Sequence, residues 1–473
     1  MRASRGAALL AAVLLAAALP GSLSAATPPP TTDYARGYTI GLEAYTYGLP
    51  LLTTDATFRT MTSVNVSNGA FGPVNQFNNV RGSNTSGSTA VVAPGSTSLS
   101  SIAWLDLRRE PQVLHVPRVT GHAFVLALID PYTENLRNFG SASHTVPGDY
   151  VIVGPGQHDV RIPKGTHRVV VDYSRIWIIG STQLLGPDDV ATVNAIQDGY
   201  TLTPLSRYGT DYAPPAPKHP KTAVTQHSVP TGLAFFDALG RQLALFPPPA
   251  RDAAALRRFA EVGIGPGMST SSDPSVSSET KRGLGDAVAA GPKAIQDDTA
   301  ALFAAGFEKH DGYLLGGFGR YGTDYTTRAV ISQIGLGAFV AHQAMYAMTW
   351  TDHEKAALSG DTAYSLHLVS PPPTHEGWSL TIYNLKGALV ANPLDRYAFT
   401  NLSPLTKNAD GSIDIYLLAT QPTDPAKVAN WLPIPAGQGF EVTWRLFAPL
   451  PAKIPGILDG TGWQPPAIEV AQE

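Results

Sequence analysis

Apolar positions recur along this chain at two spacings, one typical of helices and the other of strands. Residues 34–61, YARGYTIGLEAYTYGLPLLTTDATFRTM, carry apolar and aromatic side chains three and four positions apart, which predicts a helix. Residues 62–100 are rich in Asn, Ser, Gly and Thr and hold few strand signals. We expect a long loop there, which is either disordered or lines a site.

Short alternating runs begin at Ile102 and are separated by Pro and Gly turns. These runs are IAWLDLRR, QVLHVPRV, HAFVLALID, DYVIVGPG, HRVVVDYS and RIWIIGST. Their length and spacing predict an antiparallel β-sandwich. Beyond about residue 350 the strand pattern returns in YSLHLVS, WSLTIYNL, IDIYLLAT and FEVTWRLF, which predicts a second β region.

Between these regions the apolar period is helical. Four amphipathic stretches with Pro or Gly at their borders predict helices: DDVATVNAIQDGYTL, GLAFFDALGRQLALF, ARDAAALRRFAEVGI and PKAIQDDTAALFAAGF. The segment around PPAPKHPKTAV is a predicted linker. The fold class is therefore predicted to be mainly β with an α-helical middle. The predicted domains are a signal peptide (1–26), an N-terminal helix, long loop and sandwich (27–186), a helical segment (187–345) and a second sandwich (346–473).

The first residues of the chain predict export. Arg2 and Arg5 precede a 13-residue apolar run at 7–19, and Ser24-Ala25-Ala26 offers small residues for cleavage. Because the run is too short to span a bilayer, we expect a cleaved signal peptide. The mature protein is then secreted or periplasmic and has no membrane contact; an uncleaved anchor is the alternative.

Composition narrows the classes of function. A length of 473 residues is enough for two or three domains, and the absence of cysteine excludes thiol catalysis and thiolate metal sites. Charged residues make up only 15%, while 45 Gly and 40 Pro suit a turn-rich β protein. A net charge of −4 with no basic cluster argues against nucleic-acid binding.

A glycine-rich stretch, LLGGFGRYGTDYTTRAV at 314–330, contains the spacing G-x-G-x-x-G at Gly317, Gly319 and Gly322. In a dinucleotide site an apolar strand runs into the first glycine, and an acidic residue follows about 20 positions later. Here the lead-in EKHDGYLL is short and polar, and no acidic side chain lies between Asp324 and Asp352. The stretch therefore does not predict a nucleotide site.

Other catalytic signatures are absent from the sequence. There is no G-x-S-x-G, and none of the 12 histidines lies in H-E-x-x-H or H-x-H. The His–acid neighbours at 352–354 and 375–376 are expected to be solvated loop residues. We predict no metal site and no cofactor, with a metal site built from scattered histidines as an alternative.

The end of the glycine-rich stretch offers candidate site residues. If a helix begins at Thr323 or Asp324, Asp324 and Arg328 lie four positions apart on one face and can pair. One interpretation is a purely structural ion pair. The other makes Arg328 an anion or hydroxyl clamp and Asp324 its orienter or a general base. Tyr325 is then a proton donor or ligand contact, and Tyr321, just before the helix, a substrate contact.

A second cluster lies in EGWSLTIYNLKGALVANPLDRYAFTNL, which holds Trp378, Asn392, Arg396 and Tyr397. Aromatic faces beside amide and guanidinium groups suit a polar, ring-bearing ligand such as a sugar, although the rim of a sandwich often shows the same residues. In the functional interpretation Arg396 is a second clamp and Tyr397 a proton donor or ligand contact. This interpretation requires that both clusters face one solvent-reachable hollow.

Several motifs together resemble two families of domains of unknown function. YGTDYTTRAV, WSLTIYN, NPLDRYAF, NADGSIDIY, NWLPIPAG and GTGWQPPAI are similar to family 1214, and EAYTYGLPL, AWLDL, GDYVIVGPG and DGYTLTPLS to its N-terminal companion, family 1254. The two cover nearly all of the mature chain. The resemblance implies an immunoglobulin-like β-sandwich, a helical segment and a C-terminal jelly-roll sandwich. It also explains the glycine-rich stretch as the residues that precede the family's Tyr-Gly-x-Asp-Tyr-x-x-Arg motif.

The chain departs from the usual family pattern at four positions. Members commonly read Pro-Asn-x-Asp-Thr-Leu-Tyr-Ser before Trp-Leu-Asp-Leu, whereas this chain has PGSTSLSS, with Gly95, Thr97 and Ser100 in place of Asn, Asp and Tyr. Ser181 replaces an arginine after WIIG. A changed substrate or a non-catalytic role would follow if those groups carry the family's chemistry.

The resulting hypothesis is a metal-independent enzyme, a hydrolase or lyase, that acts on a carbohydrate or a similar polyhydroxylated small molecule. The alternative is a non-catalytic protein that binds a small-molecule or glycan ligand or interacts with a surface. A homo-oligomer is compatible with the sequence, which does not define the oligomeric state.

Overall fold

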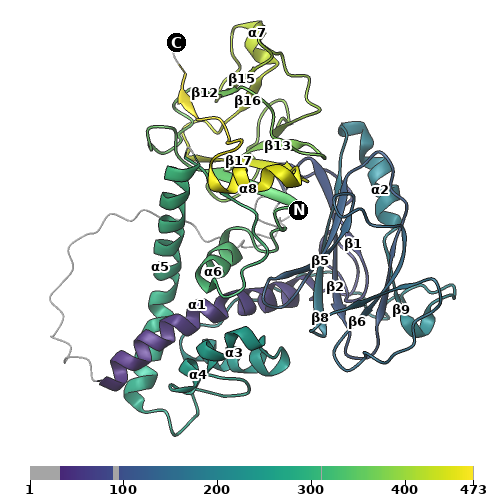
Figure 1. Ribbon diagram of the computed structural model, residues 1–473, viewed down its shortest axis with the longest axis vertical. Coiled ribbons are helices and arrows are strands. Elements are labelled where there is room, and N and C mark those ends of the chain that lie inside the picture. The colour runs from purple at the N-terminus through teal and green to yellow at the C-terminus, as the bar shows by residue number, and fades with distance from the viewer. Residues whose placement is uncertain (1–31, 89–94, 311, 472–473) are drawn as a thin grey trace.

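The computed structural model describes residues 32–88, 95–310 and 312–471. The predicted signal peptide (1–26) lies outside the described residues. Figure 1 shows two β-rich parts of the molecule with most of the helices beside and between them. None of the described helices combines the length and apolar character needed to cross a lipid bilayer.

The first β-rich part, here called the N-terminal β region, contains two sheets. The five-stranded sheet has the order β1-β2-β8-β4-β5 and the four-stranded sheet the order β7-β6-β3-β9. Pairing is antiparallel except between β6 and β7. The strands are β1 (Asn78–Asn79), β2 (Ser98–Asp106), β3 (Gln112–Val116), β4 (Phe124–Ile129), β5 (Asn135–Gly140), β6 (Gly148–Val153), β7 (His167–Val170), β8 (Arg175–Gln183) and β9 (Thr201–Pro204).

The C-terminal β region also has two sheets among the described residues, in the orders β10-β11-β17-β13-β14 and β16-β15-β12-β18. Only β15 and β16 pair in parallel. Its strands are β10 (Leu314–Gly316), β11 (Ala344–Thr349), β12 (Tyr364–Leu368), β13 (Trp378–Asn384), β14 (Ala398–Thr400), β15 (Ile413–Leu418), β16 (Trp431–Pro433), β17 (Phe440–Phe447) and β18 (Glu469–Val470).

The helices form a layer that joins the two β regions. Its main members are α1 (Thr32–Met61), α3 (Leu233–Leu245), α4 (Ala253–Ala260), α5 (Ser278–Lys309) and α6 (Tyr325–Ile334). Smaller helices are α2 (Val190–Asp198), α7 (Pro425–Val428), α8 (Ile454–Asp459), η1 (Pro187–Asp189), η2 (Leu205–Arg207), η3 (Ala250–Asp252) and η4 (Pro451–Lys453). Figure 1 shows α5 rising from this layer toward the C-terminal β region.

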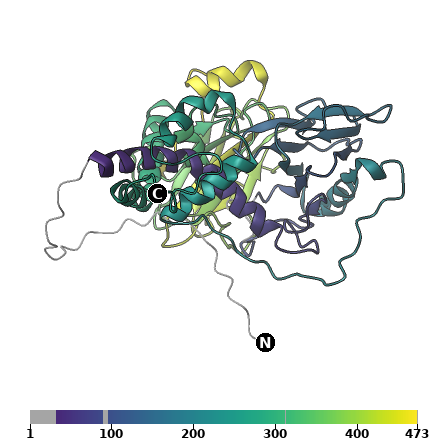
Figure 2. The ribbon, with the colours of Figure 1, turned by 90° about the horizontal axis from the view of Figure 1, so that it is seen from below.

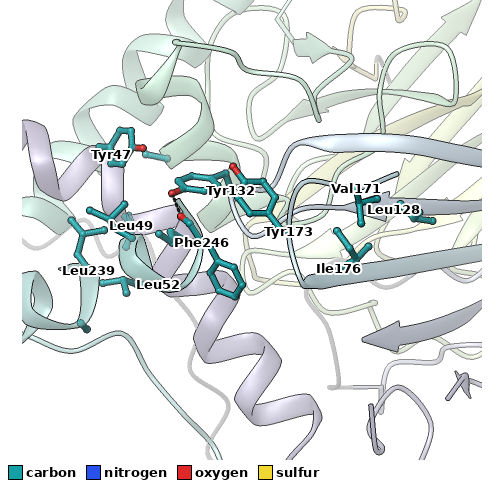
Figure 3. Close-up of a cluster of buried hydrophobic side chains, with 14 of the residues drawn as sticks. Tyr47, Leu49, Leu52, Leu128, Tyr132, Val171, Tyr173, Ile176, Leu239 and Phe246 are labelled. Atoms are coloured by element: carbon teal, nitrogen blue, oxygen red, sulfur yellow. Dashed lines mark hydrogen bonds between the residues drawn. The ribbon is translucent and has the colours of Figure 1, made fainter. Parts of the chain in front are cut away.

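The largest hydrophobic core is shared by the helical layer and the N-terminal β region. Tyr47, Leu49 and Leu52 on α1 belong to the same buried cluster as Leu128 on β4 and Ile176 on β8 (Figure 3). The C-terminal β region has a separate core, built around Trp378 and Trp444 among others. Burial of the α1 stripe therefore fixes the helices against the first β region.

Most of the predicted elements are present. The predicted helix at 34–61 is α1, and the four amphipathic stretches contain α2, α3, α4 and part of α5. The predicted linker has no helix or strand and runs along the outside of the molecule (Figure 2). The broad fold class, mainly β sheets with helices in the middle, is confirmed. Strand β9 lies in the range predicted as helical and pairs with β3.

Candidate functional site

A cleft lies between the two β regions. One of its walls is the outer face of the five-stranded sheet in the N-terminal β region. Side chains alternate between the two faces along β8, so Trp177, Ile179, Ser181 and Gln183 lie on the same face. Phe339 packs in the apolar cluster that contains Trp177 and Ile179. Further along the strand, Ser181 and Gln183 line the cleft.

The C-terminal β region supplies the opposite wall. Trp378 lies on β13, Thr400 on β14 and Phe447 on β17, and all three line the cleft. Phe339 and Gln343, in the segment before β11, close a further side. The space between these walls is about 570 Å³ when the open solvent at the mouth is included, so this is an open cleft and not an enclosed cavity.

Glu376 is the candidate acid–base group of this cleft. Among the fifteen described residues that line the cleft, Glu376 is the only ionisable one. Burial raises the pKa of its carboxyl above the ordinary glutamate value, against the opposing effects of hydrogen bonds from Ser141 and Ala142 and the charges of His375 and His144. The side chain is only half-buried. A carboxyl with a raised pKa in a cleft is a candidate acid–base group.

The remaining polar groups of the cleft are neutral. The Ser181 hydroxyl donates to Ser98 Oγ at 2.9 Å. Gln183 Nε2 donates to the backbone carbonyl of Glu376 at 3.3 Å, and Gln343 Nε2 donates to Ser143 Oγ at 2.7 Å. One N–H of each amide is therefore used within the protein, while the amide oxygens of both glutamines have no protein donor within hydrogen-bond distance among the described residues.

The predicted turn before α6 forms a different, buried cluster. Asp324 is the N-cap of α6, as predicted, and its carboxylate accepts from Thr327 N–H at 3.0 Å. The expected pair between Asp324 and Arg328 does not form, because Asp324 is exposed outside the helix while the Arg328 guanidinium is fully buried. Capping by Asp324 also places a carboxylate where a nucleotide phosphate would otherwise bind.

Arg328 is surrounded by tyrosines instead of carboxylates. Its guanidinium carbon lies 5.1 Å from the ring centres of Tyr47 and Tyr325 and 5.7 Å from that of Tyr132. Within the described residues, none of its three side-chain nitrogens has a hydrogen-bond partner. Contacts between a cation and aromatic rings stabilise such a group in part. An enclosed guanidinium of this kind does not reach a ligand in the cleft.

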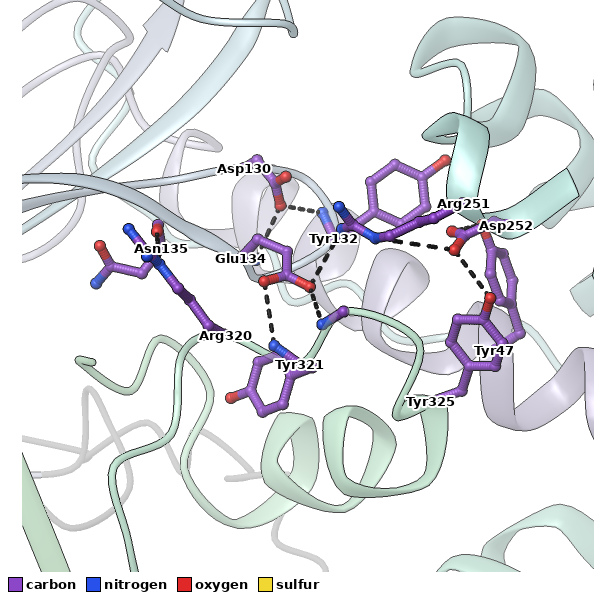
Figure 4. Close-up of polar contacts among 11 residues, drawn as sticks. Tyr47, Asp130, Tyr132, Glu134, Asn135, Arg251, Asp252, Arg320, Tyr321 and Tyr325 are labelled. Carbon is purple, nitrogen blue, oxygen red and sulfur yellow. Dashed lines mark hydrogen bonds and ion pairs between the residues drawn. The ribbon is translucent and has the colours of Figure 1, made fainter. Parts of the chain in front are cut away.

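Tyr325 is also used within the protein. Its hydroxyl donates to Asp252 Oδ1 at 2.8 Å, and the Tyr47 hydroxyl donates to Asp252 Oδ2 at 2.9 Å (Figure 4). Burial, together with the Asp252 hydrogen bond and charge, raises the pKa of Tyr325 to about 12. The Tyr325 hydroxyl proton, which was predicted to be transferred to a substrate, is thus engaged in a hydrogen bond to Asp252.

The same cluster fastens the glycine-rich stretch to the first β region. The Glu134 carboxylate, in the turn between β4 and β5, accepts the backbone N–H groups of Tyr321 and Gly322 at 3.1 and 2.9 Å (Figure 4). Gly319 has a φ of 92°, and its carbonyl accepts from Asn135 N–H at 2.7 Å. The conformation of these glycines therefore joins segments of the fold.

Three residues of the second predicted cluster form hydrogen bonds with other parts of the C-terminal β region and not with the cleft. The Asn392 side chain bonds the backbone of Val390, Leu394 and Arg396, and Arg396 Nη1 donates to the carbonyls of Val428 and Trp431. The Tyr397 hydroxyl donates to Asp395 at 2.7 Å.

The eight predicted site residues consequently fall into separate groups. Tyr321, Tyr325 and Arg328 come together in or beside the buried cluster, and Asp324 lies exposed at the start of its helix. Of the eight, Trp378 alone is among the described residues that line the cleft. The single hollow that these predictions required is therefore not lined by both clusters.

Sequence reasoning missed the group with the strongest chemistry. Glu376 belongs to a His–acid pair that was expected to be solvated, whereas its burial depends on the distant loop containing Ser141. A usable signal was present at Thr97 and Ser181, because both departures from the family pattern line the cleft. Within the described chain no group of three or more His, Asp or Glu side chains could hold a metal ion.

The fold and the cleft define a protein with two β regions, a helical layer and an open cleft between the β regions. Two family models match it, each described as a protein of unknown function: DUF1254 at residues 74–204 and DUF1214 at residues 343–451. The chain therefore carries both domains, in the order that the sequence motifs predicted. No curated protein matches the sequence.

A solved structure with a similar fold was found. The VPA0106 protein from Vibrio parahaemolyticus is similar with a TM-score of 0.66 and 18% identity, over 92% of this chain and 100% of that chain. An uncharacterized protein from Burkholderia cenocepacia aligns over 93% of this chain and 94% of its own, with 13% identity and a TM-score of 0.42. The first of these supports the overall architecture alone.

Proposed function

We propose that the protein is a metal-independent hydrolase or lyase that acts on a carbohydrate or a similar polyhydroxylated small molecule in the cleft between the β regions. The observation that carries this proposal is the half-buried Glu376 carboxyl, with its raised pKa, on the wall of the cleft. Trp378 offers an aromatic surface for a ring, and Ser98 and Ser181 offer hydroxyls.

Glu376 would act as the general acid. A carboxyl that stays protonated to higher pH than usual can donate its proton to the oxygen of a breaking C–O bond, while water or elimination completes the reaction. Most glycosidases use two carboxyl groups on either side of the bond. Since Glu376 is the sole carboxyl among the described residues lining the cleft, an ester or an eliminated oxygen is a better-matched leaving group than a glycosidic oxygen.

The test is turnover by the purified protein and its Glu376→Gln variant. A panel of glycosides, sugar esters and small polyhydroxylated esters is incubated with each, and products are identified by mass spectrometry. We expect the variant to lose about 10²-fold or more in kcat, because one positioned acid contributes roughly 10²–10⁴-fold. In the wild type, activity should fall as pH rises through the raised pKa of Glu376.

Glu354→Gln is the matched control, since Glu354 is an exposed glutamate in the same β region. This variant should keep wild-type kcat within about twofold, in line with the small effects of most exposed substitutions. Full turnover by Glu376→Gln would remove the proposed role of Glu376.

Non-catalytic ligand binding is the second candidate function. It is favoured by Thr97 and Ser181, which put small hydroxyls on the cleft wall at two positions where the family pattern has charged groups. A ligand that raises the thermal midpoint of the protein without any product in the same samples would establish this alternative.

We further propose that the N-terminal β region is an immunoglobulin-like sandwich and the C-terminal β region a jelly roll. The support is that each region has two mostly antiparallel sheets whose successive strands cross between them. Secretion or periplasmic location remains our proposal from the N-terminal sequence, and mass determination of the exported protein would test cleavage near Ala26. Light scattering by the purified protein would test whether it forms a homo-oligomer.

A further inference from the structure

The cleft differs from most sugar-acid and phosphate sites in its charge. Among the described lining residues there is no Lys, Arg or His, and the one ionisable group is the Glu376 carboxyl. His144 and His375 influence Glu376 electrostatically, but both side chains are exposed and neither lines the cleft. Proteins that bind carboxylates or phosphates use charged donors for them.

The neutral groups of the cleft suit ligands that both donate and accept hydrogen bonds. One N–H of each of Gln183 and Gln343 is used within the protein, so each side chain offers a ligand its carbonyl oxygen and one neutral N–H. The Ser181 hydroxyl also donates to Ser98. An anion would thus leave water for a site whose described lining residues offer it only neutral donors and no cation, which is unfavourable.

We propose that the cleft selects uncharged, hydroxyl-bearing ligands with an apolar face and rejects their carboxylate and phosphate counterparts. This inference rests on the proposed function in using the same cleft. Hydroxyl groups of the ligand would donate to the glutamine oxygens and to Glu376. Its apolar face would pack against Phe124, Phe339 and Trp378.

Matched probes that differ in charge test the selection. Phenyl glucoside and the methyl ester of phenyl glucuronide are neutral, whereas phenyl glucuronide carries a carboxylate. Binding to the full-length mature protein is measured by calorimetry at pH 8, where that carboxylate is ionised. We expect both neutral probes to bind at least about tenfold more tightly than the glucuronide, because the cleft offers no cation to offset the desolvation of its carboxylate.

Two variants separate the charge effect from a general loss of binding. Glu376→Gln removes the one carboxyl of the described lining residues and should not raise the preference for neutral probes, and Ser181→Arg should reverse the preference by placing a cation on the cleft wall. Glu354→Gln should leave the preference unchanged. Tighter or equal binding of the glucuronide to the wild type, or no binding of any probe, would overturn the inference.

Turnover in the same samples distinguishes this inference from the proposed function. Selective binding of the neutral probes without product would exclude catalysis on them and leave the charge selection intact. If the glucuronide is converted to product and both neutral probes are not, the charge selection is overturned, while the proposal that the protein is an enzyme stands.

Discussion

A single buried carboxyl should control how the stability of this protein depends on pH. Asp130 is buried in the turn between β4 and β5, where Oδ1 accepts the N–H groups of Tyr132 and Glu134 at 2.8 and 2.9 Å. Burial raises its pKa to about 7, with the charge of Glu134 acting in the same direction and that of Arg328 lowering it. The ordinary value in an unfolded chain is about 3.9.

Asp130→Asn should therefore stabilise the protein at alkaline pH. The folded wild type binds the extra proton between pH 4 and 7, so the contribution of Asp130 to stability is full below pH 4 and is lost as pH rises to 7. That loss is roughly 4 kcal/mol at about 1.4 kcal/mol per pH unit. Asparagine keeps the acceptor oxygen without the charge. The apparent free energy of unfolding by urea, measured at pH 4.5 and 8, checks the expectation.

The control for this substitution is Asp211→Asn, at an exposed aspartate beyond η2. It should leave the pH dependence as in the wild type. If Asp130→Asn and wild type lose stability in parallel from pH 4.5 to 8, Asp130 is already ionised in the folded protein at the lower pH.

At the scale of single residues, the sequence predicted contacts between residues of the same segment and missed contacts between residues of distant segments. The spacing in the YGTDYTTR motif correctly placed a helix start at Asp324, because capping depends on local residues. The partners of Tyr325 and Arg328 come from α1, η3 and the β4–β5 turn, and no local pattern identifies them. The raised pKa of Glu376 likewise depends on burial against a distant loop.

At the scale of elements, prediction succeeded for most of the longer elements but missed β5 and β11, which have six residues each. The six runs after Ile102 correspond to β2, β3, β4, β6, β7 and β8. Strands β10, β14, β16 and β18 have two or three residues each, too few to show an alternation, and they are fixed by pairing with longer neighbours. Helix α5 begins earlier than its apolar stripe and continues through Pro292.

Two glycines on α5 should respond to alanine in opposite directions. A Cβ on Gly283 would lie 2.3 Å from the carbonyl oxygen of Tyr34, so Gly283→Ala must push α1 and α5 apart. We expect a loss of about 1–3 kcal/mol. A Cβ on Gly285 would meet nothing within 4 Å, so Gly285→Ala should add about 0.5–1 kcal/mol through helix propensity.

Chemical unfolding followed by circular dichroism compares the two variants on the same helix. A lower denaturant midpoint for Gly283→Ala together with a higher one for Gly285→Ala supports close packing of α1 on α5. Equal stabilisation by both substitutions would mean that the two helices can separate without loss, and the shared core would then not depend on their contact.

At the scale of the whole molecule, the cleft exists because one segment joins both β regions. Phe339 packs in the outer-face cluster of the first sheet, and the Gln343 carbonyl accepts from Ala448 N–H in the C-terminal β region at 2.9 Å. Gln183 and Glu376 meet across the cleft. A ligand bound there contacts parts of the chain that no local sequence pattern relates, so the site could be located only from the fold.

Because the chain has no cysteine, single thiols can report on both walls of the cleft. Thr97→Cys lies on the first β region and Thr400→Cys on the second, and both positions line the cleft. Saturating phenyl glucoside should slow alkylation of both thiols several-fold by covering them, since thiol reactivity depends on access. Val170→Cys, at an exposed position on β7 outside the cleft lining, should react at the same rate with and without the ligand. Protection of only one of the two cleft thiols would place the ligand on a single β region, and the joining segment would then have no part in binding.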